Sequence, residues 1–120
     1  MVLRPLDLTI TQFTILQALS LAGEVSQGRL GAILAMDSTT LTRTLEIMSG
    51  HGWIAKQPGT DRRQRRLRLS PAGRAEFQRA LPHWERAQEE VRAALGEERW
   101  NQLNTLIHQV TVQVTLAAAQ

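Results

Sequence analysis

The sequence contains no cysteine, which excludes disulfide bonds, thiol redox sensing and cysteine-based zinc sites. A reducing cytoplasm is the natural setting for such a chain. No apolar run approaches the roughly 20 residues of a membrane-spanning helix, and residues 1–5 lack the apolar core of a signal peptide. We therefore expect a soluble, cytoplasmic protein.

The sequence also lacks the signatures of catalysis and of metal binding. The three histidines, His51, His83 and His108, are each isolated from other ligand-type residues at metal spacing. No nucleophile elbow, glycine-rich phosphate loop or metalloprotease motif occurs. The carboxylates fall in exposed helical runs rather than in the apolar settings that perturb a pKa. We therefore expect no enzyme, no cofactor and no metal site.

Length and charge indicate one basic domain. The chain has 120 residues, of which 42% are hydrophobic and 21% charged, enough apolar material for a single core. Its formal net charge is +3, and the positive excess is concentrated, because five arginines fall within residues 62–68. The C-terminal third is instead rich in glutamate. Such asymmetry predicts that one end of the molecule faces a polyanion.

Capping residues predict three helices in the first half of the chain. Thr9 and Gln12 have the form of a capping box, in which each side chain satisfies a free amide at a helix start. Ser26 is expected to cap a second, short helix, and Asp37 a third that ends near residues 50–52. Apolar residues at helical spacing should form the core: Phe13, Leu16, Leu19, Leu30, Ile33, Leu34, Leu41, Leu45 and Met48.

A β hairpin should follow the third helix. Residues 53–57 are a candidate strand, and residues 58–61 contain the turn-forming Pro-Gly pair. Leu67 and Leu69 alternate with arginines, which is the period-two pattern of a half-buried strand. The hairpin would therefore carry a strongly basic loop at its tip.

Two long helices are expected to complete the chain. Ser70 and Pro71 are typical of an N-cap followed by proline at the first helical position. Pro82 lies inside this helix and predicts a kink or a break, while Gly96 separates it from the last helix. Residues 110–115 alternate with period two, so a strand is the alternative there. We favour helix, because the 3.6-residue pattern continues into this segment.

The outer face of the third helix is a candidate DNA-recognition surface. It carries Ser38, Thr39, Thr42 and Arg43. Two short helices joined by a brief turn fit a major groove, where hydroxyls approach base edges and an arginine reaches guanine or phosphate. The alternative interpretation is an ordinary solvated helix face.

The arginine-rich loop is the second candidate. Arg62, Arg63 and Arg65 would form a cationic finger that enters an A·T-rich minor groove or lies along phosphates. Asp61 could pair with one of them and hold the shape of the loop. The alternative, a solubilising basic loop, is disfavoured because clustered like charges repel unless a polyanion relieves them.

Several motifs, in this order and spacing, resemble those of the MarR family over about residues 6–95. They are Leu8-Thr9-x-x-Gln12-Phe13-x-x-Leu16, Ser26-Gln27-x-x-Leu30, Asp37-Ser38-Thr39-Thr40-Leu41-Thr42-Arg43, and Asp61-Arg62-Arg63 leading to Leu69-Ser70-Pro71-Ala72-Gly73. The last of these is the most specific. The C-terminal helix agrees with the family in pattern only.

The resemblance implies a mainly α (α+β) fold, a winged helix-turn-helix with a two-stranded β wing and long C-terminal dimerisation helices. Residues 1–73 would form the DNA-binding region and residues 74–120 the helical dimerisation region, within a single compact domain. It also implies a homodimeric transcriptional repressor on a pseudo-palindromic operator in double-stranded DNA, released by a small aromatic ligand. By position, the four residues of the third helix would meet the major groove and Arg63 the minor groove.

Three departures from the family pattern bear on these expectations. Members usually have another helix before the Leu8 position, so either the start is truncated here or the dimer relies on the C-terminal helices. Ala35 stands at a turn position where glycine is common, which is tolerable only if its backbone avoids the left-handed region. Ile47 stands where a charged residue is frequent, so something is expected to cover it.

Two alternatives stay open. Trp84 could line a ligand pocket between the winged region and the long helices, although aromatic residues at helical spacing more often pack in a core or a dimer interface. Winged helices also serve as protein-interaction modules that bind no DNA. The arginine cluster argues against such a module here.

Overall fold

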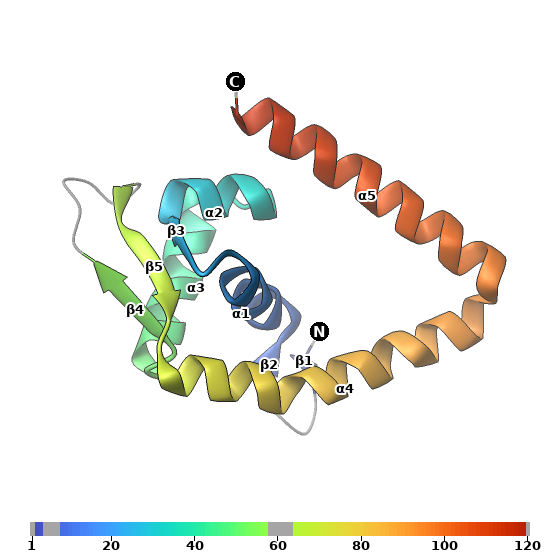
Figure 1. Cartoon of the computed structure of the whole chain (residues 1–120), viewed down its shortest axis with the longest axis horizontal. Helices are drawn as coiled ribbons and strands as arrows, with labels where there is room; N and C mark the ends of the chain where they lie inside the picture. Colours follow the sequence, from blue (N-terminus) through green and yellow to red (C-terminus); the bar gives the residue numbers. More distant parts are fainter. Residues whose placement is uncertain (1, 4–7, 58–63, 120) are drawn as a thin grey trace.

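The structure of this protein is a computed structural model. It describes the backbone of residues 2–3, 8–57 and 64–119, and the side chains of residues 8–57 and 64–109. Within these residues the expected order of three helices, a hairpin and two long helices is confirmed (Figure 1). The elements are β1 (Val2–Leu3), β2 (Leu8–Thr9), α1 (Ile10–Ala22), β3 (Glu24–Ser26), α2 (Gln27–Leu34), α3 (Ser38–Gly50), β4 (Ile54–Gln57), β5 (Arg66–Leu69), α4 (Pro71–Leu95) and α5 (Glu97–Ala119).

Four helices begin at the N-caps that the sequence predicts. At α1 the capping box is complete, because the side chain of each partner accepts a hydrogen bond from the backbone amide of the other. At the other three helices, the cap side chain accepts from the amide three residues ahead, which satisfies one of the free amides of the first turn. The cap-to-amide pairs are Thr9–Gln12, Ser26–Arg29, Asp37–Thr40 and Ser70–Gly73.

The hydrophobic core surrounds α1, which lies in the middle of the molecule between α2, the sheet and α4 (Figure 1). Phe13 is fully buried, and its ring stacks on Phe77 and Trp84 of α4 at centroid distances of 5.6 and 5.0 Å. Aromatic pairs at these distances add to the free energy of burial. The buried apolar residues are Leu8, Phe13, Ile15, Leu16, Leu19, Val25, Leu30, Leu41, Leu45, Met48, Ile54, Leu67, Leu69 and Ala80.

The wing is the antiparallel hairpin β4–β5, but the sheet has a third strand that the sequence did not predict. Strand β3 pairs with β5 on its other side, in the order β3-β5-β4. Leu67 and Leu69 are buried, and Arg66 and Arg68, which alternate with them, are exposed, as the pattern predicts. Val25 of β3 lies opposite Leu67 and is buried too. With only three residues, β3 is too short to show a periodic pattern, so pairing with β5 alone defines it.

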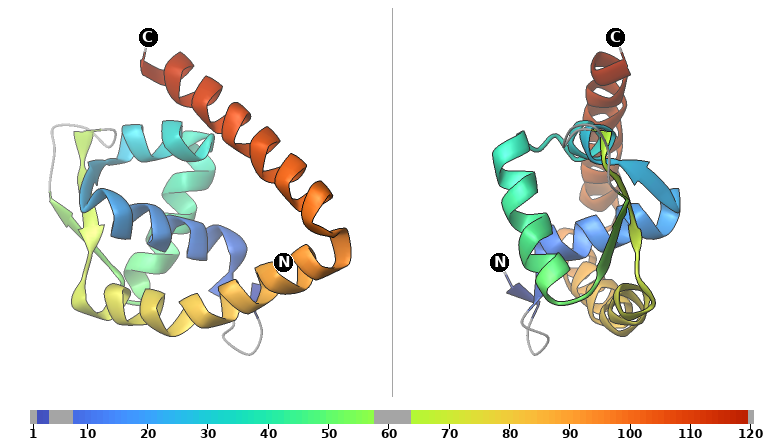
Figure 2. Two further views of the ribbon diagram at one scale, coloured as in Figure 1. Left: turned by 45° about the vertical axis from the view of Figure 1, so that its right-hand side comes forward. Right: turned by 90° about the vertical axis from the view of Figure 1, so that its left-hand side faces the viewer.

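The two C-terminal helices form an elbow at the far end of the molecule from the wing (Figure 2). Of the kink or break expected at Pro82, the break does not occur, because α4 continues through it from Pro71 to Leu95, and the kink stays a prediction. The elbow lies instead at Gly96, whose φ of 82° is one that glycine adopts readily. Helix α5 then returns to lie against α2, and its final residues are helical, as expected. None of the helices in the described part of the chain is long and apolar enough to cross a membrane.

Candidate nucleic-acid interface

Helix α3 has one buried face and one polar face. Leu41, Leu45 and Met48 are buried against the core, as their spacing predicts. Ser38, Thr39 and Arg43 are exposed, and Thr42 is partly buried at the edge of this face. In the right-hand view of Figure 2, α3 forms an outer edge of the molecule. The four predicted contact residues therefore lie on a helix that a large ligand can approach.

The charged cap of α3 uses some of the polar groups at its start. Both the backbone amide and the hydroxyl of Thr40 donate to the Asp37 carboxylate, at 2.7 and 2.9 Å. These hydrogen bonds, the backbone one first, hold the pKa of Asp37 below its ordinary value, and the charge of Arg43 adds a smaller effect. Thr40 is thus a structural residue, whereas the side chains of Ser38 and Thr39 stay exposed to solvent.

Arg43 is the cationic residue of this face. Its side chain is exposed and forms no ion pair with any residue that the structure describes. A guanidinium at a helix surface that is not engaged in an ion pair can offer its parallel donors to a guanine edge or to a phosphate.

Sequence reasoning missed the role of Gln27. This residue is 5% exposed, and its side-chain amide donates from Nε2 to Oγ1 of Thr42 at 3.0 Å. Its backbone N–H donates to the carbonyl of Arg65, the residue that directly precedes β5 of the wing, at 2.8 Å. The first residue of a short helix is usually solvated, so nothing in the local pattern indicated a buried amide. Its presence in the Ser-Gln motif was the only signal.

The turn between α2 and α3 differs from the sequence-based expectation. Ala35 has φ 55° and ψ 40°, so it lies in the left-handed region that we expected it to avoid. The N–H of Met36 bonds the carbonyl of Gly31 at 3.0 Å, and that of Ala35 bonds the carbonyl of Ala32 at 3.3 Å. These two bonds satisfy carbonyls at the end of α2, and closing the turn in this way requires a positive φ.

In the described part of the wing, Arg65 lies at the loop end of β5 and is partly buried, whereas Arg66 and Arg68 of the strand itself are exposed. Arg66 approaches Glu24 of β3 at 3.8 Å, and an exposed ion pair at this distance contributes little to the stability of the fold. Asp61, Arg62 and Arg63 lie outside the described residues. Their predicted roles in the loop therefore stay predictions.

An apolar groove lies between α1, α2 and α5. Trp84 is not among its lining residues and stacks on Phe13 instead, so its proposed ligand contact stays a prediction.

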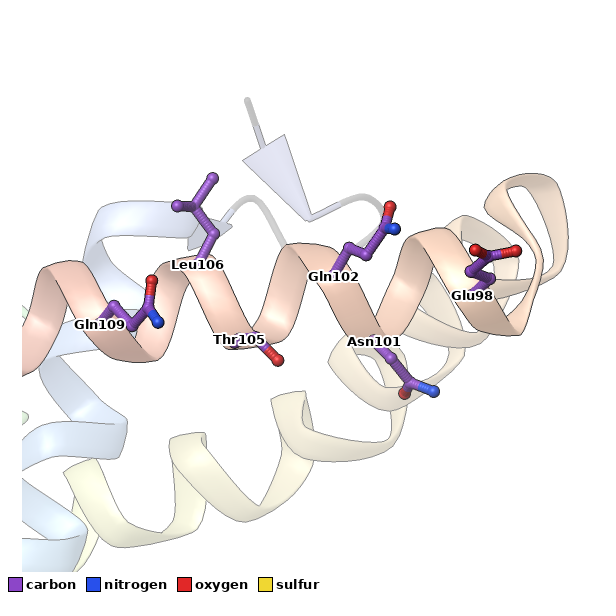
Figure 3. A pocket seen from close by; sticks show the side chains of 6 residues that line it. All are labelled: Glu98, Asn101, Gln102, Thr105, Leu106 and Gln109. Carbon is purple, nitrogen blue, oxygen red and sulfur yellow. The ribbon is translucent and has the colours of Figure 1, made fainter.

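A second, open hollow follows α5, where Figure 3 shows Leu106 among polar side chains. Among the described residues, no group of three or more histidines or acidic residues is placed to hold a metal ion. The apolar groove between α1, α2 and α5 is lined by Thr14, Gln17, Ala18, Leu21, Ala22, Val25, Leu30, Ile33, Leu34 and Ile107.

Ile47 lies on the exposed side of α3 and is 51% exposed. It borders a shallow hollow together with the first turn of α1 and with Thr40 and Thr44. The expected cover over Ile47 is therefore not supplied by the described residues of this chain.

Comparison with known proteins agrees with this architecture. The model of the MarR family matches residues 8–64. The multiple antibiotic resistance protein MarR of Salmonella typhimurium is 38% identical over 74 residues, which are 61% of this chain and 51% of that protein. The chain thus spans about half the length of this curated relative.

Two solved structures extend the likeness to nearly the whole chain. The M. tuberculosis transcriptional regulator MosR in complex with DNA is 36% identical with a TM-score of 0.77, over 96% of this chain and 83% of that one. A mutant MarR from E. coli complexed with operator DNA is 26% identical with a TM-score of 0.76, over 90% and 79%. With the motifs, the three-helix order and the wing all in agreement, this chain belongs to the MarR family.

Proposed function

We propose that this protein is a transcriptional regulator that binds double-stranded DNA through the polar face of α3 and the arginine-rich wing. The observation that carries the proposal is the exposed face of Ser38, Thr39 and Arg43. The Arg43 guanidinium forms no ion pair with a carboxylate among the described residues. The DNA present in the MosR and MarR structures supports the same assignment.

Each part of the interface has a separate task. The α3 side chains would read base edges in the major groove, where hydroxyls and a bidentate arginine discriminate between base pairs. The wing arginines would neutralise phosphates or enter the minor groove, with Arg63 at the tip in that groove. Arg66 and Arg68 lie further from the tip and should contribute less.

Specific binding also requires two copies of the α3 surface, so the proposal includes a homodimer on a pseudo-palindromic operator. Apolar side chains on α1, α4 and α5 stay exposed in the single chain, among them Leu21 at 83% and Leu106 at 58%. A second copy that covers them would remove this apolar area from water. Occupying the operator would make the protein a repressor.

Release by a small aromatic ligand is the remaining part of the proposal. The apolar groove between α1, α2 and α5 joins the winged region to the C-terminal helices, so a ligand there would alter how the two α3 helices are spaced. Benzoate is a suitable first probe. It should raise the thermal unfolding temperature and weaken operator binding, and Ala18→Trp, which fills the groove, should abolish both effects.

The test of DNA recognition begins with selecting bound sequences from a random DNA pool. Arg43→Ala should then lower affinity for the selected sequence by roughly 1–3 kcal/mol, as loss of a bidentate base contact requires. Random DNA should be bound nearly as before. Arg99→Ala, on the exposed surface of α5, is the matched control and should change neither affinity. Equal losses on both DNAs would reduce Arg43 to a phosphate contact.

The wing is tested by salt dependence. In the Arg62/Arg63/Arg65 triple alanine variant, the slope of log affinity against log salt should shrink by about 0.9 for each lost phosphate contact. Circular dichroism and light scattering must show that the variant is folded and dimeric. A folded, dimeric variant with unchanged affinity and slope would favour the protein-interaction module over the DNA-binding regulator.

A further inference from the structure

We infer that Gln27 positions the hydroxyl of Thr42 as a hydrogen-bond donor toward DNA, so that a buried residue of α2 sets part of the sequence preference of α3. The inference rests on the proposed function, because it assumes that the α3 face reads base edges. Gln27 itself is buried and would touch no DNA, so its role is one of positioning.

The geometry connects the two residues directly. Gln27 is the first residue of α2, and its side chain is 5% exposed. Its Nε2 donates to Thr42 Oγ1 at 3.0 Å, so the bond joins the start of α2 to the outer part of α3. A buried amide loses much of its hydration, so this hydrogen bond has little competition from water. The contact therefore favours the Thr42 rotamer that accepts this hydrogen bond.

The direction of this hydrogen bond leaves the Thr42 proton unused. A threonine hydroxyl has one proton to donate and two lone pairs to accept with, and Gln27 occupies one of the lone pairs. Thr14 and Thr44 instead donate their protons back to helix carbonyls, Ile10 O at 2.8 Å and Thr40 O at 2.9 Å. No described residue accepts the Thr42 proton in this way.

A hydroxyl with a free proton and one of its two lone pairs already occupied favours acceptors over donors on a base edge. Purine N7, guanine O6 and thymine O4 are acceptors in the major groove, whereas cytosine N4 and adenine N6 are donors. Thr42 held by Gln27 should prefer the acceptors. The preference arises from the hydroxyl orientation and would be lost if the side chain turned freely.

Gln27 also connects α3 to the wing. Its backbone N–H donates to Arg65 O at 2.8 Å, so one residue bonds to both elements that are proposed to contact DNA. A side-chain substitution leaves this backbone bond in place. Variants at position 27 therefore isolate the Thr42 contact from the wing contact.

The experiment uses the full-length protein, the DNA sequence it selects from a random pool, and random-sequence DNA. The variants are Gln27→Met, which keeps the side-chain length without the donor, Thr42→Val, and the two combined. Gln27→Glu replaces the donor with a carboxylate, which would accept the Thr42 proton and reverse the hydrogen bond. Thr44→Val is the matched control, because the Thr44 hydroxyl already donates to its own helix.

Gln27→Met and Thr42→Val should each weaken binding to the selected sequence about 5- to 10-fold, the effect of one hydrogen bond, and binding to random DNA by less than about 2-fold. The double variant should lose no more than Thr42→Val alone, because the two residues act as one unit. Gln27→Glu should lose at least as much as Gln27→Met, and Thr44→Val should leave the ratio of the two affinities unchanged.

Three results would overturn the inference. They are additive losses in the double variant, equal losses on selected and random DNA, or a folded Gln27→Met variant with unchanged preference. If Gln27→Met does not fold, as thermal unfolding would show, Gln27→Glu supplies the same comparison at nearly the same volume. A wild-type protein without any sequence preference would overturn the proposed function, whereas wild-type preference with unaffected Gln27 variants would overturn this inference alone.

Discussion

At the scale of single residues, Gly73 shows why the most specific motif of the sequence ends in glycine. A Cβ atom built on Gly73 would lie 2.1 Å from the carbonyl oxygen of Trp53. The obstacle is backbone, so it cannot rotate away as a side chain can. The first turn of α4 is therefore able to approach the start of β4 closely only because position 73 has no side chain.

We predict that Gly73→Ala destabilises the protein by about 3 kcal/mol or more, because overpacking against backbone forces elements apart. Urea unfolding measures the effect. Gly50→Ala is the control, since a Cβ there meets nothing within 4 Å and alanine favours the helix. Equal stability of the two variants would show that the α4–Trp53 contact relaxes easily.

Ala35 adopts a backbone conformation that favours glycine over alanine. Its φ of 55° is the only positive value among the non-glycine residues that the structure describes. We predict that Ala35→Gly stabilises the protein by about 0.5–1 kcal/mol, because relief of the left-handed strain exceeds the added entropy of the unfolded chain. Ala32→Gly, inside α2, should instead destabilise it by about 1 kcal/mol. Thermal unfolding of the two variants in opposite directions is the expected result.

At the scale of elements, an ion pair spans the elbow between α4 and α5. Arg92 bonds both carboxylate oxygens of Glu97, at 2.6 and 2.9 Å, across Gly96. The Arg92 hydrogen bond, with a smaller effect of its charge, lowers the pKa of Glu97. Because the pKa of Glu97 is depressed in the folded state, the ion pair contributes to the free energy of unfolding at neutral pH. It is lost as the pH falls through that lowered value.

We predict that the Glu97 carboxylate titrates below the ordinary glutamate range in the wild-type protein and returns toward it in Arg92→Gln. Side-chain carbon NMR of Glu97 against pH checks this directly. The Arg79→Gln variant, which breaks a separate ion pair with Glu76, should leave the titration of Glu97 unchanged. If Arg92→Gln also has no effect, the bidentate pair does not persist in solution.

At the scale of the whole molecule, the long helices extend beyond the core that they help to form. Phe77 and Trp84 of α4 pack against α1, but further along the chain Val91, Leu103, Leu106 and Ile107 are all more than a third exposed. Soluble monomers seldom leave such a series of large apolar side chains on two consecutive helices. A second copy of the chain is the partner that the proposed function requires.

We predict that Leu103→Glu and Ile107→Glu each weaken dimerisation by about 100-fold or more, because every dimer loses two buried apolar side chains and gains two charges. Sedimentation at micromolar concentration measures this. Thr105→Glu is the control, since Thr105 lies two residues from both, on the opposite side of α5. If the two variants unfold instead of forming folded monomers, Leu103 and Ile107 belong to the core of a single chain and not to a dimer interface.

Sequence reasoning predicted the helices well, because their signals are local. A cap and the amide that it accepts from lie three residues apart, and the apolar stripe of α3 repeats every three or four residues. It did not predict β3, and the break that it allowed at Pro82 does not occur. A strand of three residues is too short to show a periodic pattern. The 25-residue helix α4 packs against α1 and therefore tolerates the loss of the one backbone hydrogen bond that proline cannot make.

The candidate site divides in the same way. The residues Ser38, Thr39, Thr42 and Arg43 were predicted from the capped, amphipathic pattern of one helix. The wing arginines were predicted from their clustering beside a turn between two strands. The sequence by itself therefore determined which side chains are candidates to meet DNA. Only the tertiary structure decided that Gln27 bonds Thr42, that Ala35 is left-handed and that Gly73 lies against Trp53. Each of these depends on how separate segments pack against one another. No local pattern of residues encodes a distance of that kind.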